Sequence, residues 1–497
     1  MQLDYFYNFS GRVFPDYSVN SFDTMIVTDG YVLRTGFNMP IPAGNVTKHD
    51  LGGAIVMPPF VDSHTHFLQT GIVLSGLQLN KARSLNDIFD SILLESKKNK
   101  IIIGWNLDIQ SLKEKRFPTQ AELDKVSSNN FIWLVSTDLH MAVANSEALK
   151  WAMQKYPKLE HIKGLVSGSS YNAISYKING LLTDNYKFKC LQKAEEICIK
   201  KGVGTVHALE GTENDFSETL LVDRFFENSN IEGIIYNQSS IPDLPLKKEW
   251  KQMGGCILVD GSLSSHTAAL SENYNDLKTS GNLFLNSEKI MEITKTAYTN
   301  KLQLALHAIG DMACEIVSAS YSWAYDNFGE SLLGNRIEHF MMPNNRAIRN
   351  ARKSQTIIGI QPAYDYFWGG KNGMYSERLG IKRAMACNPF KTLSDSGISL
   401  IGGSDSPVTP IDPILGIHSI VNHKNPDEQL SLNQAFNIFI NEPHRTVGNF
   451  EKRGHLKTGK RADFICLDTD PFAIAKQRIK DIKVISMYLS GKKVNEA

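Results

Sequence analysis

The stretch Val-Asp-Ser-His-Thr-His at residues 61–66 decides the fold, because it places two histidines directly after an apolar run at residues 54–60. In an extended strand, side chains two residues apart point the same way, so His64 and His66 face one point. Imidazole nitrogen is a ligand for zinc, iron, copper and nickel. The motif therefore predicts part of a metal site at the end of a strand.

Other short apolar runs follow along the chain, with stretches between them that are long enough for helices. This alternation of strand and helix is typical of a parallel sheet, and eight such strands would close a TIM-type (β/α)8 barrel. We predict the strands at residues 53–60, 131–136, 204–208, 255–259, 302–306, 336–338, 356–360 and 398–402. The fold class expected is α/β, with functional residues at the carboxyl ends of the strands.

The two ends of the chain do not follow this alternation. Residues 1–56 and 445–497 contain short extended pieces with turn signals such as Asp29-Gly30 and Gly491-Lys492. We expect them to form a small composite β-sandwich domain. The barrel then covers residues 57–444, with a helical insertion at about 155–190 that could act as a lid.

Three more polar residues lie where predicted strands end. His307 follows the run at 302–306, His339 ends the run at 336–338, and Asp405 comes after the run at 398–402. Four of the thirteen histidines and one carboxylate thus occupy the ends of four predicted strands. Histidines with a purely structural role have no reason to prefer strand ends, so the set predicts a metal site.

Several longer motifs carry a family resemblance. They are Val-Asp-Gly-Ser-Leu-Ser-Ser-His-Thr-Ala-Ala-Leu at 259–270, His-Ala-Ile-Gly-Asp at 307–311, Arg-Ile-Glu-His at 336–339, Gly-Ser-Asp-Ser-Pro-Val at 403–408, and His140 followed by Ala-Asn-Ser-Glu-Ala-Leu at 144–149. With them the chain resembles the metal-dependent amidohydrolase superfamily. It is similar, more narrowly, to the amidohydrolase 3 branch, which includes N-substituted formamide deformylases.

One position departs from that branch, where a lysine commonly lies four residues before the Asp-Gly of the fourth strand and can bridge two metals as a carbamate. Counting back from Asp260 places Cys256 there. A thiolate is a good zinc ligand and could bridge two ions. A small buried cysteine that packs as a hydrophobe is the alternative. If Cys256 is no ligand, a site for a single metal is favoured.

The resemblance implies a divalent metal, zinc by preference, that lowers the pKa of a bound water and delivers hydroxide to an sp² carbon. Asp405 would act as general base and then as proton donor to the leaving nitrogen. With two ions, His64, His66 and Asp405 would hold one, and His307 and His339 the other. With one ion, His339 would be free to polarise the substrate.

A second group of residues is expected around the substrate. By resemblance, His140 faces the pocket, while Asp260 shapes the loop after the fourth strand or caps a turn. His266 occupies a position that is often arginine in the branch. Trp105 and an aromatic cluster would line an apolar pocket or belong to the core; the cluster is Tyr364, Tyr366, Phe367 and Trp368.

The function predicted is hydrolysis of a C–N bond in a small-molecule amide, N-formyl compound or cyclic amide. A deaminase that releases ammonia is the first alternative, and a barrel without catalysis is the second. The formal net charge of +1 argues against nucleic acid or a membrane surface as partner. We expect a cytoplasmic protein, and a homodimer only because dimers are common.

Overall fold

The computed structural model describes residues 2–137 and 141–494. The chain forms two compact units, one made of Met1–Phe67 with Glu195–Ala497 and the other of Leu68–Ala194. The larger unit contains both ends of the chain. Among the described residues, no helix combines the length and the apolar character needed to cross a membrane.

Parallel strands form the centre of the larger unit. One sheet has the order β12-β11-β5, and the other has the order β13-β14-β15-β16-β17. Their bounds are β5 Phe60–Thr65, β11 Val203–Glu210, β12 Glu232–Asn237, β13 Gln252–Leu258, β14 Gln303–Ala308, β15 Arg336–His339, β16 Ile357–Ile360 and β17 Leu400–Gly402. A parallel bridge between Thr65 and Ser406 joins the end of β5 to the segment after β17. The ladders are interrupted between β12 and β13, so closure of a complete barrel stays a prediction.

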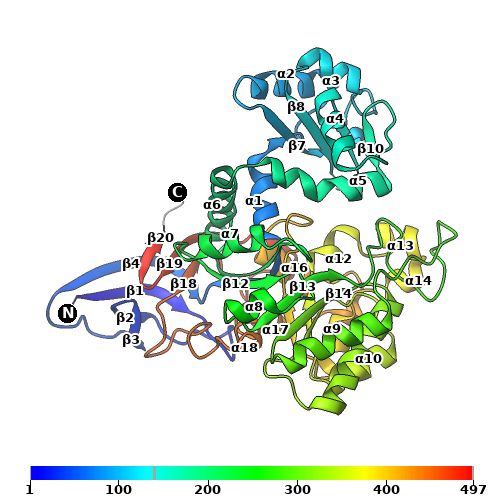
Figure 1. The fold of residues 1–497 in the computed structure, drawn as a ribbon. Coiled ribbons are helices and arrows are strands. Elements are labelled where there is room, and N and C mark those ends of the chain that lie inside the picture. Colours follow the sequence, from blue (N-terminus) through cyan, green and yellow to red (C-terminus); the bar gives the residue numbers. More distant parts are fainter. Residues whose placement is uncertain (1, 138–140, 495–497) are drawn as a thin grey trace. The chain divides into compact units, whose positions relative to one another are not determined.

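Helices follow most of these strands in the larger unit (Figure 1). They are α7 Ser217–Phe226, α8 Asp243–Lys247, α9 Ser287–Thr299, α10 Asp311–Phe328, α11 Asn345–Lys353, α12 Ala363–Trp368, α13 Met374–Leu379, α14 Ile381–Ala384, α15 Phe390–Asp395, α16 Pro413–Val421, α17 Leu432–Ile440 and α18 Glu442–Thr446. Several begin at side chains that cap the helix: Asn286 before α9 and Asn344 before α11 each accept a backbone hydrogen bond. Strands covered by helices are buried on both faces, and every residue of β11 is buried.

Two of the predicted barrel strands are corrected by the structure. Phe131–Ser136 is a strand, β8, but it pairs in the sheet of the smaller unit. The structure adds a parallel strand beside β11, β12, which was not predicted because Glu232 and Gly233 interrupt its apolar pattern. The run at 53–60 is also split at Pro58-Pro59 between β4 and β5, since proline cannot donate to a ladder.

Strands from both ends of the chain form one seven-stranded sheet, in which the blue and red segments lie side by side (Figure 1). Its order is β20-β19-β18-β4-β1-β2-β3, with bounds β1 Leu3–Gly11, β2 Thr24–Thr28, β3 Tyr31–Gly36, β4 Val46–Met57, β18 Phe464–Leu467, β19 Val484–Leu489 and β20 Lys492–Val494. The Phe464 and Tyr488 rings stack 4.5 Å apart, and Phe6 meets both edge-on. The two ends of the chain therefore form one sheet, as expected, whereas a sandwich of two sheets stays a prediction.

The smaller unit has its own five-stranded sheet, ordered β10-β9-β8-β7-β6. Its elements are α1 Phe67–Ser75, β6 Leu77–Gln78, α2 Leu85–Ser96, β7 Ile101–Leu107, α3 Gln120–Val126, β9 Met141–Ala144, α4 Ser146–Lys155, β10 Leu165–Ser167, α5 Gly168–Ser175 and α6 Asp184–Lys200, together with β8. This unit is longer than the insertion expected at 155–190, and it contains a sheet as well as helices. The domain boundaries expected from the sequence stay predictions.

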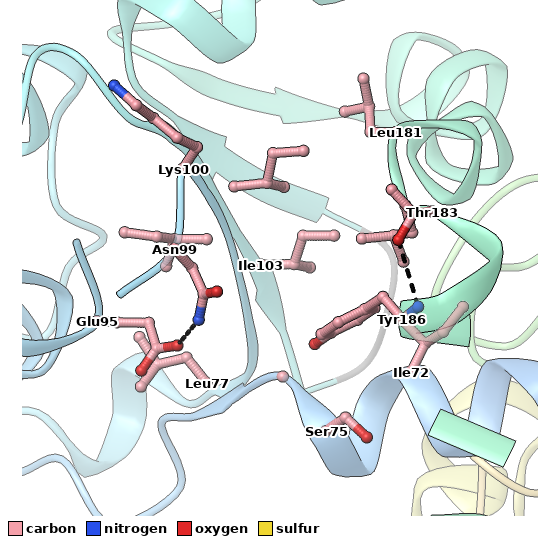
Figure 2. A pocket seen from close by; sticks show the side chains of 14 residues that line it. Ile72, Ser75, Leu77, Glu95, Asn99, Lys100, Ile103, Leu181, Thr183 and Tyr186 are labelled. Carbon is pink, nitrogen blue, oxygen red and sulfur yellow. Dashed lines mark hydrogen bonds between the residues drawn. The ribbon is translucent and has the colours of Figure 1, made fainter. Parts of the chain in front are cut away.

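A cavity of about 200 Å³ lies within the smaller unit, between α1, β7 and the start of α6 (Figure 2). Ile72, Ile103 and Leu181 supply apolar walls, and Tyr186 and Lys100 supply polar groups. None of the site residues predicted from the sequence lines this cavity. The predicted site therefore has to be sought at the strand ends of the larger unit.

Candidate metal centre

His64, His66 and Asp405 meet where β5 approaches the segment after β17. The Nε2 atoms of both histidines lie 3.2 Å from Oδ1 of Asp405. Backbone pairing fixes this approach, because the Asp405 N–H donates to the His64 carbonyl at 2.7 Å and the His66 N–H donates to the Ser406 carbonyl at 2.9 Å. The same-side arrangement that the His-x-His spacing predicts therefore brings both imidazoles to one carboxylate oxygen.

Cys256, His307 and His339 come together from the ends of β13, β14 and β15. The Cys256 Sγ atom lies 3.5 Å from His307 Nδ1 and 4.0 Å from His339 Nε2. The two histidine rings meet edge-on with their centroids 4.4 Å apart. A ring contact of 5.1 Å between His64 and His339 connects this group to the first one.

The two groups form one cluster of possible metal ligands. Three overlapping sets each have ligand atoms within 4.8 Å of one another: His64, His66 and Cys256; Cys256, His307 and His339; and His64, His339 and Asp405. Cys256 belongs to two of these sets. Its position thus agrees with that of a bridging ligand between two ions, although its part in binding stays a prediction.

Two of the clustered residues have a backbone conformation that side chains other than glycine seldom adopt. The φ angle is 55° at Asp405 and 71° at His339. A non-glycine residue in this left-handed region is strained by about 1–3 kcal/mol, and such strain concentrates at functional sites. The turn at each strand end aims these two side chains into the cluster.

Charge controls the protonation of Asp405 and its neighbours. Burial raises the pKa of Asp405, but the charge of His64 and the close contacts with His64 and His66 outweigh it and hold the pKa well below the usual value. Burial lowers the pKa of His66, whereas its contacts with Asp405 and Cys256 raise it to about 10. In the metal-free protein the carboxylate is therefore ionised beside an imidazolium.

The surroundings of Cys256 favour its charged form. Burial raises the pKa of its thiol, but the charge of His307 and the hydrogen bonds from His307 and His339 hold the pKa well below its usual value. Cys256 affects His307 in return. Burial alone would lower the pKa of the His307 imidazole, but the charge of Cys256 and the hydrogen bond with it raise the pKa to about 8. A thiolate is the form of cysteine that binds metals.

The donor set fits a divalent metal. The ligand atoms His64 Nε2 and Asp405 Oδ1 are buried without a well-formed hydrogen bond, although buried polar atoms normally have a partner. Imidazole, thiolate and carboxylate together are the ligands that zinc takes in proteins. A cation among these residues would satisfy the unpaired atoms and balance the charges of Asp405 and Cys256.

Comparison with known proteins gives the family. A model described as the amidohydrolase family, Amidohydro_3, matches residues 49–495. The chain belongs to this family. The resemblance to the amidohydrolase 3 branch is thereby confirmed.

Individual relatives cover almost the whole amidohydrolase chain. Protein LONG AFTER FAR-RED 3 of Arabidopsis thaliana is 26% identical, over 98% of this chain and 90% of its own length. N-substituted formamide deformylase of Arthrobacter pascens is 21% identical, over 89% of this chain and 88% of its own length. An uncharacterised metal-dependent hydrolase of Pyrococcus horikoshii has 24% identity and a TM-score of 0.79, over 96% of this chain and 99% of its own. Family membership supports an enzyme that hydrolyses carbon–nitrogen bonds with a divalent metal.

The residues predicted to contact substrate in this amidohydrolase have mixed placements. Tyr364, on α12, donates a hydrogen bond to Asp405 Oδ2. Asp260 is buried and accepts hydrogen bonds from the backbone N–H groups of Ala269, Ile309 and Gly310 at 2.8–3.0 Å, so it shapes the loop after β13. His266 forms an ion pair with Asp276 at 2.9 Å. Their contacts with substrate stay predictions.

Trp105, a further residue predicted from the sequence, is not part of this cluster. Trp105 belongs to β7 of the smaller unit, where its ring packs beside Gly76. His140 lies outside the described residues. The roles expected for both in the substrate pocket stay predictions.

A buried group of polar side chains next to the ligands was not predicted from the sequence. Glu338 accepts from His64 Nδ1 at 2.6 Å, and Arg336 pairs with Glu338 at 2.7 Å. Both belong to the Arg-Ile-Glu-His motif at residues 336–339. The available signal was the two-residue spacing in β15, which points Arg336 and Glu338 to the same side of the strand.

Proposed function

We propose that the protein hydrolyses a C–N bond in a small-molecule amide, N-formyl compound or cyclic amide, with zinc as its metal. The observation that carries this proposal is the convergence of His64 Nε2 and His66 Nε2 on one oxygen of Asp405, at 3.2 Å each. These two imidazoles and the Asp405 carboxylate would hold a cation, and the charged carboxylate would lie next to that cation. Similarity to a formamide deformylase over most of the chain supports the choice of substrate class.

Asp405 would move the protons of the reaction. As an ionised carboxylate it takes a proton from the attacking water and then gives one to the leaving nitrogen. The products are a carboxylic acid and an amine, so one water is consumed for each bond broken. Tyr364 donates to Oδ2, and this hydrogen bond fixes the orientation of the carboxylate during both transfers.

A bound divalent metal supplies Lewis acidity, which lowers the pKa of water towards about 7 and polarises the substrate carbonyl. His64, His66 and Asp405 would hold one ion, and His307 and His339 a second one, with Cys256 between them. If a single ion is bound, the His339 imidazole is available to donate to the substrate carbonyl oxygen. The 4.4 Å ring contact with His307 keeps His339 at the cluster in either case.

A deaminase that releases ammonia is the second candidate. The observation that favours it is Cys256, which replaces the lysine that bridges two metals in the resembling branch, because deaminases of this superfamily use a single ion. The two candidates differ in their products. Amide hydrolysis releases a carboxylate together with an amine or ammonia, whereas deamination of an amidine releases ammonia and no carboxylate.

We also propose the finer architecture expected from the sequence. The eight parallel strands β5 and β11–β17 would form a TIM-type barrel, and the strands of both chain ends would form a β-sandwich. The order of the strands and the Thr65–Ser406 bridge support the barrel. A small-molecule substrate and a cytoplasmic homodimer complete the proposal.

The test is a product assay on a substrate panel. Protein purified without chelator, then stripped of metal and reconstituted with Zn²⁺, is given N-formyl amines, simple amides, cyclic amides and aminopurine-type amidines. We expect formate or another carboxylate from the first three classes, only in the reconstituted sample. A His66→Ala variant prepared in parallel controls for contaminating hydrolases. Ammonia from the amidines alone would select the deaminase, and no turnover of any class would reject the proposal.

A further inference from the structure

A continuous set of buried polar side chains lies next to His64, away from the ligand cluster. His64 Nδ1 faces Glu338 Oε2 at 2.6 Å, and Glu338 Oε1 faces Arg336 at 2.7 Å. Arg336 also lies 3.0 Å from His207 Nδ1 and donates to the Ser63 carbonyl at 2.8 Å. The side chains of His64, Glu338 and Arg336 are all 0% exposed.

The cost of burying these charges requires an explanation. An ion pair taken out of water is often no more stabilising than apolar residues of the same size. Here the buried ion pair of Glu338 and Arg336 contacts His64, a predicted metal ligand, on one side. On the other side, Arg336 contacts His207. His207 accepts from Arg336 because burial and the Arg336 charge hold its pKa well below the usual value and keep it neutral.

Two glycines leave the room that this arrangement needs. A Cβ atom at Gly359, on β16, would lie 2.2 Å from Glu338 Oε2. A Cβ atom at Gly403 would lie 2.5 Å from His64 Cβ. Both approaches are closer than side chains tolerate, so glycine at these positions makes room for the Glu338 carboxylate and for the His64 backbone and Cβ atom.

Histidine binds a metal through a nitrogen that carries no proton, and a hydrogen bond at the other nitrogen decides which one that is. We propose that Glu338, held in place by Arg336, is a positioning residue that keeps the proton of His64 on Nδ1. Nε2 then presents its lone pair to the cluster, 3.2 Å from Asp405. This inference rests on the metal centre of the proposed function and concerns how its first ligand is oriented.

The shape of the arginine explains why this residue type stands at position 336. Its guanidinium reaches three partners on different sides at once: His207, the Ser63 carbonyl and Glu338. Its Cζ atom also lies 4.7 Å from the centre of the Tyr236 ring. Because Arg336 contacts β5, β11, β12 and β15, the position of Glu338 is fixed by four strands.

The test uses Glu338→Gln, which keeps the shape and removes the charge. Gln has one accepting oxygen and one donating NH2 group, so it cannot both accept from His64 Nδ1–H and accept from Arg336. We expect binding of Zn²⁺ to the stripped protein to weaken by about 10–100-fold, the usual effect of losing such a partner. Competition with a coloured chelator measures the affinity, and the visible spectrum of the Co²⁺ form reports the altered ligand geometry.

The matched control is Glu428→Gln. Glu428 is also buried, and it accepts from the backbone and side chain of Thr392 without contacting any of the clustered residues. We expect this variant to bind Zn²⁺ as the unchanged protein does. A purely structural role for Glu338 predicts instead that its variant melts earlier but binds Zn²⁺ normally, and that outcome would overturn the inference.

A second variant, Glu338→Asp, tests the same inference if the Glu338→Gln protein does not fold. Glu338→Asp keeps the charge beside Arg336 but shortens the reach to His64 by one methylene, so weaker Zn²⁺ binding in a folded protein is again expected. Normal affinity in this variant would likewise overturn the inference. These experiments measure Zn²⁺ affinity and not turnover. A protein that binds Zn²⁺ but hydrolyses no C–N bond would therefore contradict the proposed function and leave this inference standing.

Discussion

The two halves of the metal centre are fixed in different ways. His64, His66 and Asp405 are tied by backbone hydrogen bonds between the end of β5 and the segment after β17, and Glu338 holds the far side of His64. Cys256, His307 and His339 come from the neighbouring strands β13, β14 and β15 of one sheet, and Cys256 Sγ lies 3.5–4.0 Å from the two imidazoles. The first half thus joins β5 to the segment after β17, whereas the second half is centred on the Cys256 sulfur.

Glycines and loops reinforce this difference. On the first side, Gly403 lies so close to His64 that a Cβ atom would clash. On the second side, His307 Nε2 lies 3.2 Å from the Gly261 carbonyl and 3.6 Å from Asp260, both at the start of the loop after β13. Changes to the first half should therefore abolish catalysis, and changes to the second should alter how many ions are bound.

The largest effect is expected from Asp405→Asn. An amide cannot take a proton from water, so turnover should fall by at least about 10²–10⁴-fold while substrate binding remains measurable. Steady-state kinetics and a direct binding assay check this. Asp365→Asn is a matched control, because the two aspartates are equally buried: Asp365 is 4% exposed and Asp405 is 5% exposed. Asp365 follows Tyr364 in the chain but does not belong to the ligand cluster. An active Asp405→Asn enzyme would remove Asp405 from its catalytic role.

An intermediate effect is expected from Cys256→Ala, which tests the second half. Elemental analysis should find two ions per chain in the unchanged protein and one or none in the variant, because the thiolate that joins the two sites is lost. Cys466→Ala, a buried cysteine of β18, is the control and should leave the metal content unchanged. One ion in every sample would make Cys256 a packing residue and favour the deaminase.

The smallest effect is the pH dependence of metal binding. The raised pKa values of about 10 for His66 and about 8 for His307 keep both imidazoles protonated in the metal-free protein at pH 7. A metal must displace these protons, so its affinity should rise with pH, by roughly tenfold per pH unit for each proton, until the pKa values are passed. Calorimetry in buffers of different ionisation enthalpy measures the protons released. Equal heats in all buffers would contradict the expectation, and His66→Ala should release about one proton fewer.

Most of the clustered residues could be found from the sequence, because their local patterns carry the information. His64 and His66 follow from a two-residue spacing, and His307, His339 and Asp405 follow from apolar runs that end in a polar side chain. The strand β12 could not be found in this way, because Glu232 and Gly233 make its first half look like a loop. Phe131–Ser136 was assigned to the barrel for the opposite reason, since an apolar run does not say which sheet it joins.

The sequence by itself therefore determined the family, the α/β class and the ligand types, all of which depend on residues near one another in the chain. Only the tertiary structure decided which strands pair, how Glu338 and Arg336 lie behind His64, and why Gly359 has no side chain. The physical reason is that these contacts join residues far apart in sequence, such as His64 and Glu338. Their distance depends on how several strands pack together, and no local spacing encodes it.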